Sequence, residues 1–159
     1  TKSVQIIFNM LRLKPAEEFF NLAKDKGVAI IVRVPLASGL LTGKMNSNST
    51  FPENDHRNYN INGDAFDVGE TFSGVDFNTA LKVVDELKSI TPEGFSLSQL
   101  ALKWILMHDA VSVIIPGAKN SDQVLSNISA SSLPDISNLM KQIENIYATY
   151  LKDDIHPRW

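Results

Sequence analysis

One apolar run constrains the fold of this chain more than any other feature. Residues Val28–Val34 are apolar at every position except Arg33, without the alternation of a strand that has one face in water. A run of this kind is typical of a parallel strand buried on both faces. A second β-branched run, Val4–Phe8, precedes it, and parallel strands require a long crossover between them. We therefore expect a βαβ unit over residues 3–34.

The crossover between these two runs has the pattern of a helix. Pro15 suits a first helical position, and Gly27 is a typical helix stop after a basic last turn. The apolar stripe expected to face the sheet consists of Phe19, Phe20, Leu22 and Ala23. This stripe predicts that the helix packs against the strands.

A third strand is predicted at Val111–Ile115, between two pairs of helices. One helix spans residues near 76–90, and a capping box of Ser96 and Gln99 opens a second that reaches about His108. The positions expected to be buried in these two helices are Ala80, Leu81, Val83, Val84, Leu87, Leu97, Leu100, Ala101, Trp104 and Ile105. The element order therefore favours the α/β class.

Two further helices are predicted after the third strand. Asn120 or Ser121 can cap the first of them, which runs to about Ser129, and the second begins near Pro134. The apolar face of the second consists of Ile136, Leu139, Met140, Ile143, Tyr147 and Tyr150. Their i, i+3, i+4, i+7 spacing is typical of an amphipathic helix.

Residues 35–74 differ from the rest of the chain, because they are rich in Gly, Pro, Asn and Asp and lack a clear period. A stretch of this length without secondary structure is uncommon in a compact domain unless it has a function. We expect it to be a long binding loop or lid within a single domain over residues 1–159.

Composition excludes several classes of function. The chain is 43% hydrophobic with a net charge of -3, so nothing in its overall charge favours nucleic acid or an anionic membrane surface. It has no cysteine, which excludes disulfides and cysteine-ligated zinc, and its apolar runs are too short to span a membrane. Thr1 opens the sequence without a signal-peptide pattern, as if the chain began within a longer protein. We expect a cytoplasmic protein with no nucleic-acid or membrane partner.

The turns after the second and third strands are the candidate binding elements, since ligands of α/β folds bind at the carboxyl ends of parallel strands. Residues 33–44 hold small residues and glycines between Arg33 and Lys44, and residues 114–123 lead from a strand through Gly117 and Lys119 into a helix N-terminus. Taken singly, each is also compatible with a glycine turn beside solvated cations. Together they favour a phosphate-bearing ligand that contacts both strand ends.

Histidines and paired carboxylates are weak catalytic candidates. His56 lies between Asp55 and Arg57, and we interpret it as a polar loop residue, since neighbours in a chain rarely point together. His108 ends a helix, where a cation is favoured, and His156 is near a terminus expected to fray. No spacing typical of a metal site is present. We predict neither catalytic nor metal-ligating residues in this chain.

Four segments resemble the aldo-keto reductase family in order and spacing. Pro35–Lys44 is similar to the family signature after the seventh strand, and Ile114–Asn120 with Gln123 and Asn127 is similar to the signature after the eighth. Val4 and Gln5 look like the sixth strand, and Leu97–Trp104 looks like the helix before the eighth. The resemblance implies part of a (β/α)8 TIM barrel containing strands six to eight, a C-terminal segment with three parallel strands and flanking helices.

The resemblance also implies a set of cofactor-binding residues. Gln5 matches a glutamine that binds the nicotinamide carboxamide, and Arg33 stands where many members carry an aromatic ring that stacks on the nicotinamide. The pyrophosphate would be lined by Leu36, Ser38 and Gly39, with Lys44 paired to it and Val34 in the same set. Around the 2′-phosphate and adenine the set comprises Gly117, Ala118, Lys119, Gln123 and Asn127. NADP is the expected cofactor, with NAD possible, because Gly117, Ala118 and Gln123 depart from the family's Lys, Ser and Arg.

The same resemblance implies an oxidoreductase that reduces small aldehydes or ketones to alcohols. The family's catalytic Asp, Tyr, Lys and His lie on strands that precede the part matched here, so the isolated chain is expected to be inactive. Three strands cannot close a barrel, and their free edges could pair with another copy. Two alternatives stay open: a non-enzymatic, channel-associated subunit that binds NADPH, and a phosphate-binding module of another barrel.

Overall fold

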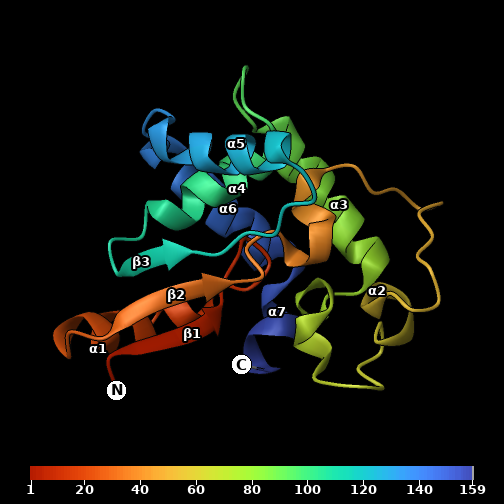
Figure 1. Cartoon of the computed structure of the whole chain (residues 1–159), viewed down its shortest axis with the longest axis horizontal. Coiled ribbons are helices and arrows are strands. Elements are labelled where there is room, and N and C mark those ends of the chain that lie inside the picture. The colour runs from red at the N-terminus through yellow and green to blue at the C-terminus, as the bar shows by residue number, and fades with distance from the viewer. Residues whose placement is uncertain (159) are drawn as a thin grey trace.

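The computed structural model describes residues 1–158, in which a three-stranded parallel sheet forms the centre (Figure 1). The strands are β1 (Ser3–Ile7), β2 (Ala29–Arg33) and β3 (Val111–Ile114), in the order β1-β2-β3. Both pairings are parallel, so the carboxyl ends of all three strands meet at one edge. The predicted α/β class, with three parallel strands and flanking helices, is confirmed.

Helices connect the strands and cover them. The α-helices are α1 (Phe19–Asp25), α2 (His56–Tyr59), α3 (Phe77–Ser89), α4 (Leu97–Leu106), α5 (Ser121–Ser129), α6 (Ser137–Tyr150) and α7 (Lys152–Ile155). Short 3-10 helices are η1 (Lys14–Ala16), η2 (Ala37–Thr42), η3 (Val68–Glu70), η4 (Phe72–Gly74), η5 (Ala130–Ser132) and η6 (His156–Arg158). In Figure 1, α4, α5 and α6 lie on the β3 side of the sheet, and α2 and α7 lie beyond the ends of the strands.

Helix starts follow the predicted capping residues. The hydroxyl of Ser96 accepts from the Gln99 amide at 3.2 Å, and the Gln99 side chain accepts from the Ser96 amide at 2.9 Å, which confirms the capping box at α4. Asn120 caps α5 by accepting from the Gln123 amide at 3.0 Å. These caps fix where the two helices that flank β3 begin.

The main core lies between the sheet and α1, α3, α4 and α6. Trp104 and Phe8 stack with their ring centroids 4.9 Å apart, His108 contacts both rings edge-on, and Phe20 contacts Phe8 edge-on. Burial lowers the pKa of His108, so this ring disfavours the charged form. The prediction that His108 serves as a cation at a helix end is therefore wrong, because its ring packs into the aromatic cluster.

Two exposed side chains and the C-terminal turn differ from the expectations. Leu22 is 56% exposed because the face of α1 that holds Phe20 and Ala23 leaves it on the outer side. Tyr150, at the end of α6, is 37% exposed. His156 does not lie in a frayed end: it contacts the Tyr147 hydroxyl at 3.1 Å and the Glu17 carboxylate at 3.0 Å, which joins η6 to α6 and to the residue that follows η1.

Residues 35–74 contain η2, α2, η3 and η4, so this segment is built from short helices rather than from one extended loop. Asn60 is fully buried within it and accepts from the amides of Ala65 and Phe66 at 2.9 Å. Among the described residues, no helix is both long and apolar enough to cross a membrane.

Candidate functional site

The turns that follow β2 and β3 lie next to each other. The Ile115 amide donates to the Val32 carbonyl at 3.0 Å, which extends the parallel pairing to the last residues before both turns. The chain leaves β2 through Val34 and Pro35, and it leaves β3 through Pro116 and Gly117. The two predicted turns therefore begin next to each other at the same edge of the sheet.

The first turn has an unusual backbone. Val34, Ala37 and Ser38 have φ values of 51°, 47° and 56°, in the left-handed region that L-residues other than glycine seldom adopt. For a β-branched residue such as Val34 this conformation is strained, and strain of this kind clusters at binding sites and switches. Gly39, at φ 97°, meets the same backbone requirement without a side-chain penalty.

Asn9 holds this turn in its strained shape. Its side chain is fully buried and donates to the Val34 carbonyl at 2.9 Å and to the Ser73 hydroxyl at 2.9 Å. Its carboxamide oxygen accepts from the Leu11 amide at 2.9 Å. One side chain thus joins the end of β1, the end of β2 and η4.

The second turn is open to solvent. Gly117, Ala118 and Lys119 are exposed, and a Cβ added at Gly117 would meet no atom within 4 Å. Gln123 accepts from the Lys119 amide at 2.7 Å, and Asn127 donates to the Gly117 carbonyl at 3.3 Å. Both amide side chains therefore brace the turn from α5, while the Lys119 side chain stays at the surface.

Gln5 and Arg33 share one face of the sheet. Gln5 pairs with Ile31 across the strands, and Arg33 follows Ile31 by two residues, so their side chains point the same way. Val113 pairs with Ile31 from the other side and is also exposed. The structure thus leaves this face of the sheet partly open, with one amide and one guanidinium on it.

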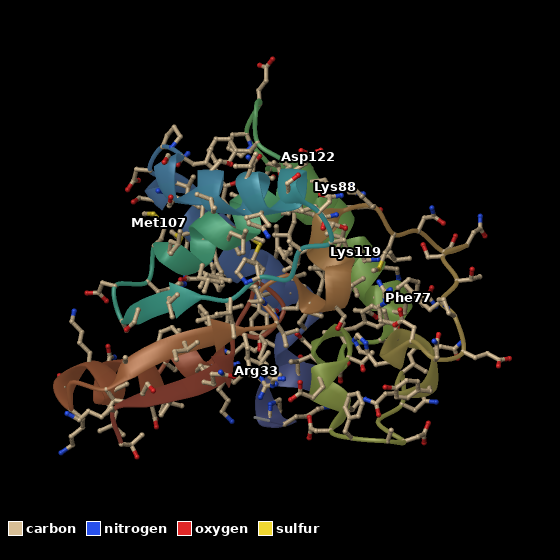
Figure 2. The ribbon with its side chains drawn as sticks, viewed as in Figure 1. Arg33, Phe77, Lys88, Met107, Lys119 and Asp122 are labelled. Carbon is tan, nitrogen blue, oxygen red and sulfur yellow. The ribbon has the colours of Figure 1, made fainter. Side chains whose placement is uncertain are left out.

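The remaining predicted residues lie on or beside η2. Leu36 packs against the core, Ser38 and Gly39 are half-buried, and Lys44 is exposed just after the helix. Lys88 of α3 approaches the same turn, since a Cβ built at Gly43 would come within 2.9 Å of its side-chain Cε. Figure 2 labels Lys88 and Lys119 above Arg33 in this view.

The His56 ring lies between the side chains of Asp55 and Ser38, but the three residues do not form a catalytic triad. His56 Nδ1 is 3.6 Å from the Asp55 carboxylate, and His56 Nε2 is 3.4 Å from the Ser38 hydroxyl. The Ser38 oxygen already accepts from the Phe72 amide at 3.2 Å and lies 3.3 Å from the Glu70 carbonyl. These long contacts and the engaged hydroxyl favour a role in joining η2 to the segment around η3 and η4.

Asp55 is held ionised by Arg57. Two guanidinium nitrogens of Arg57 donate to its carboxylate at 2.9 Å and 2.6 Å, and the Arg57 amide donates at 2.9 Å. These bonds, those of the Arg57 side chain first, keep the pKa of Asp55 well below its usual range. A carboxyl group with a depressed folded-state pKa stabilises the fold above its unfolded pKa, and this contribution is lost as the pH falls.

We expect Asp55→Asn to lower the free energy of unfolding by about 1 kcal/mol at pH 7, since Asn keeps the helix cap but loses the ion pair. The difference between the variant and the parent chain should shrink below about pH 4, where the unfolded carboxyl group is protonated. Urea unfolding between pH 3 and pH 7 measures this difference. Asp64→Asn, which alters an exposed carboxylate of the same segment, is the control; an unchanged difference across this pH range would contradict the prediction.

Several residues of this region were missed from the sequence. Asn9, Glu70 and Lys88 reach the first turn or its flanks from distant positions in the chain, and Ser73 joins it through Asn9; no short motif marks these residues. Glu70 in particular forms two hydrogen bonds with Arg33. Among residues 1–158, no group of three or more His, Cys, Asp or Glu side chains is arranged to hold a metal ion.

Comparison with known proteins points to one family. The family model described as the aldo/keto reductase family matches residues 1–148. Aldo-keto reductase YhdN of Bacillus subtilis is 28% identical over 161 residues, covering 99% of this chain and 45% of its own length. A probable voltage-gated potassium channel subunit beta of Arabidopsis thaliana is 33% identical over 129 residues, covering 77% of this chain and 36% of that protein.

Solved structures give the same result for the fold. The glycerol dehydrogenase AKR11B4 of Gluconobacter oxydans matches 94% of this chain and 43% of its own chain, with a TM-score of 0.74 and 23% identity. The holo form of aldo-keto reductase AKR11C1 of Bacillus halodurans matches 91% of this chain and 42% of its own, with a TM-score of 0.62 and 26% identity. The chain therefore spans less than half the length of these relatives, and its architecture is that of part of their (β/α)8 barrel.

Proposed function

This chain belongs to the aldo/keto reductase family, and from that premise we propose that it is the cofactor-binding C-terminal part of an NADP(H)-dependent carbonyl reductase. In this proposal β1, β2 and β3 are strands six to eight of the barrel, and residues 35–74 are the cofactor and substrate segment. The substrate class is small aldehydes and ketones, which are reduced to alcohols. The bound nicotinamide supplies the hydride for this reduction.

The observation that carries the proposal is the pairing of the two turns at one edge of the sheet. The Ile115–Val32 hydrogen bond brings the strained turn at Val34–Gly39 beside the open turn at Gly117–Lys119. Small residues and glycines allow close approach of a ligand to the backbone, and Lys44 and Lys119 are exposed cations suited to phosphate groups. These groups fit NADP, which has a pyrophosphate and a separate 2′-phosphate.

Each predicted residue has a part in this proposal. Gln5 and Arg33 would hold the nicotinamide end, since they share the open face of the sheet. The pyrophosphate would bind along η2, at Val34, Leu36, Ser38, Gly39 and Lys44. At the adenosine end the residues are Gly117, Ala118, Lys119, Gln123 and Asn127, with Gln123 and Asn127 acting through the shape of the turn that they brace.

NADPH binding tests the proposal directly. We expect the whole protein in which residues 1–159 occur to bind NADPH more tightly than NADH, because Lys119 can pair with the 2′-phosphate. Lys119→Ala should weaken NADPH binding about tenfold and NADH binding by less than about twofold, since a charge-assisted hydrogen bond contributes about 1.5 kcal/mol or more. Titrations with NADPH and with NADH, each followed by the fluorescence of the reduced nicotinamide, measure the two affinities. The control is Lys26→Ala, which replaces an exposed lysine after α1.

The same titration separates the alternatives. If inorganic phosphate binds as tightly as NADPH and NADH do, the chain is a phosphate-binding module and the proposal fails. The likeness to a potassium channel subunit beta favours a second candidate, a channel-associated subunit that binds NADPH without carbonyl reduction. Co-purification with a membrane complex, together with NADPH binding and no turnover of aldehydes by the whole protein, would support it. For residues 1–159 alone we expect no reductase activity, because the catalytic residues are proposed to lie outside them.

A further inference from the structure

The side chain of Arg33 is fixed by a carboxylate from residues 35–74. Glu70, the last residue of η3, accepts two parallel hydrogen bonds from Arg33, from Nη1 to Oε1 and from Nη2 to Oε2, both at 2.6 Å. The side chain of Arg33 is 35% exposed and that of Glu70 is 30% exposed, so water only partly screens the interaction between them. A bidentate contact of this kind fixes the plane of a guanidinium as well as its position.

Glu70 is itself held in place. Asp67 caps η3 by accepting from the Gly69 amide at 2.8 Å. The Ser38 hydroxyl contacts the Glu70 carbonyl at 3.3 Å and accepts from the Phe72 amide at 3.2 Å. Hydrogen bonding to Arg33 lowers the pKa of Glu70 and raises that of Arg33, so both groups are charged at neutral pH. Arg33 is therefore fixed in place and its charge is opposed by Glu70, on which Arg12 acts as a second nearby cation.

This compensation matters for the ligand of the proposed function, on which the inference rests. An uncompensated guanidinium on the open face beside Gln5 would present a full positive charge to the nicotinamide end of the cofactor. The nicotinamide ring is cationic when oxidised and neutral when reduced. A cation near the ring therefore weakens binding of the oxidised cofactor selectively, and this electrostatic repulsion is strong where water is partly excluded.

We propose that Glu70 neutralises and orients Arg33, and thereby sets the affinity of the site for the oxidised cofactor relative to the reduced one. Glu70 is in this sense a positioning residue that acts through Arg33. Because it lies 37 residues after Arg33, it also makes cofactor preference depend on how residues 35–74 are folded at the ends of the strands. Figure 2 shows Arg33 at the end of β2, its last residue, where this segment meets the strand ends.

Glu70→Gln in the whole protein tests the inference, because Gln keeps the shape of the side chain but removes its charge. We expect the Kd for NADP⁺ to rise about tenfold while the Kd for NADPH changes by less than about twofold. NADPH fluorescence gives one constant, and displacement of NADPH by NADP⁺ gives the other. Arg33→Gln combined with Glu70→Gln should return the ratio of the two constants to that of the parent, since neither charge remains.

Glu53→Gln, an exposed carboxylate of the same segment, is the matched control and should leave the ratio unchanged. If Glu70→Gln weakens both forms of the cofactor equally, or leaves both unchanged, Glu70 has no electrostatic part in cofactor preference and the inference is overturned. If the parent protein binds neither form, the proposed function fails and the inference with it. The parent titration therefore distinguishes failure of the function from failure of the inference alone.

Discussion

Asn9→Ala is expected to lower the free energy of unfolding by about 3 kcal/mol, the largest effect of any single polar substitution considered for this chain. The change removes three hydrogen bonds made by a fully buried side chain, to the Val34 carbonyl, the Ser73 hydroxyl and the Leu11 amide. A buried polar group left without its partner costs about 1–3 kcal/mol, and three such groups would be left here. Urea unfolding followed by circular dichroism measures the change.

The same substitution should also weaken NADPH binding by the whole protein, because the strained turn at Val34 loses the side chain that holds it. Asn9→Asp separates the donor from the acceptor. Its carboxylate can still accept from the Leu11 amide, but it cannot donate to the Val34 carbonyl, so we expect it to be at least as destabilising as Asn9→Ala. Asn21→Ala, in an exposed position of α1, is the control and should change stability by less than about 0.5 kcal/mol. Stability of Asn9→Ala within this control range would contradict the bridging role of Asn9.

Local patterns predicted most of the fold, because they are governed by interactions between near neighbours in the chain. The capping box at Ser96 is set by residues three apart, and the run Val28–Val34 marks the central strand β2 directly. Leu22 was placed in the core wrongly, because apolar residues close together in a short helix need not share a face. His108 was treated as a cation because its position at a helix end is visible in the sequence, whereas the rings of Phe8 and Trp104 that bury it come from elsewhere.

The candidate site shows the same division. The glycine turns near Gly39 and Gly117 could be found because each is a continuous stretch. Asn9 and Glu70 could not be found in this way, because Asn9 is 25 residues from Val34 in the sequence and Glu70 is 37 residues from Arg33. Neither residue stands in a recognisable motif. The roles assigned to Gln5 and Arg33 came from family resemblance, and the register of β1 on β2 adds that both lie on one face. The structure therefore adds to the candidate site the residues that hold its turns, which the sequence did not reveal.

Exposed apolar side chains lie on two elements at the β3 side of the molecule, the end of β3 and α5. Val113 and Ile115, at and just beyond β3, are 44% and 47% exposed, and Leu125 and Ile128 of α5 are 65% and 62% exposed. Figure 1 shows α5 on the outer side of the sheet, and β3 is an edge strand among the described residues. Exposed apolar side chains beside a free strand edge favour association. We infer that further β/α units of a closed barrel cover these side chains, since the glycerol dehydrogenase structure matches 94% of this chain with only 43% of its own.

Residues 1–159 produced alone are therefore expected to self-associate through these side chains. Apparent mass in sedimentation should rise with concentration, and a hydrophobic dye should bind. The double substitution Leu125→Lys and Ile128→Lys should reduce both signals several-fold, because two charges on the exposed face of α5 oppose burial, while lysine retains helix propensity. Leu22→Lys, on the exposed side of α1, is the matched control and should leave both signals as they are. A monomeric parent that binds no dye would show that these side chains need no cover, and the barrel that we propose would lose one of its supports.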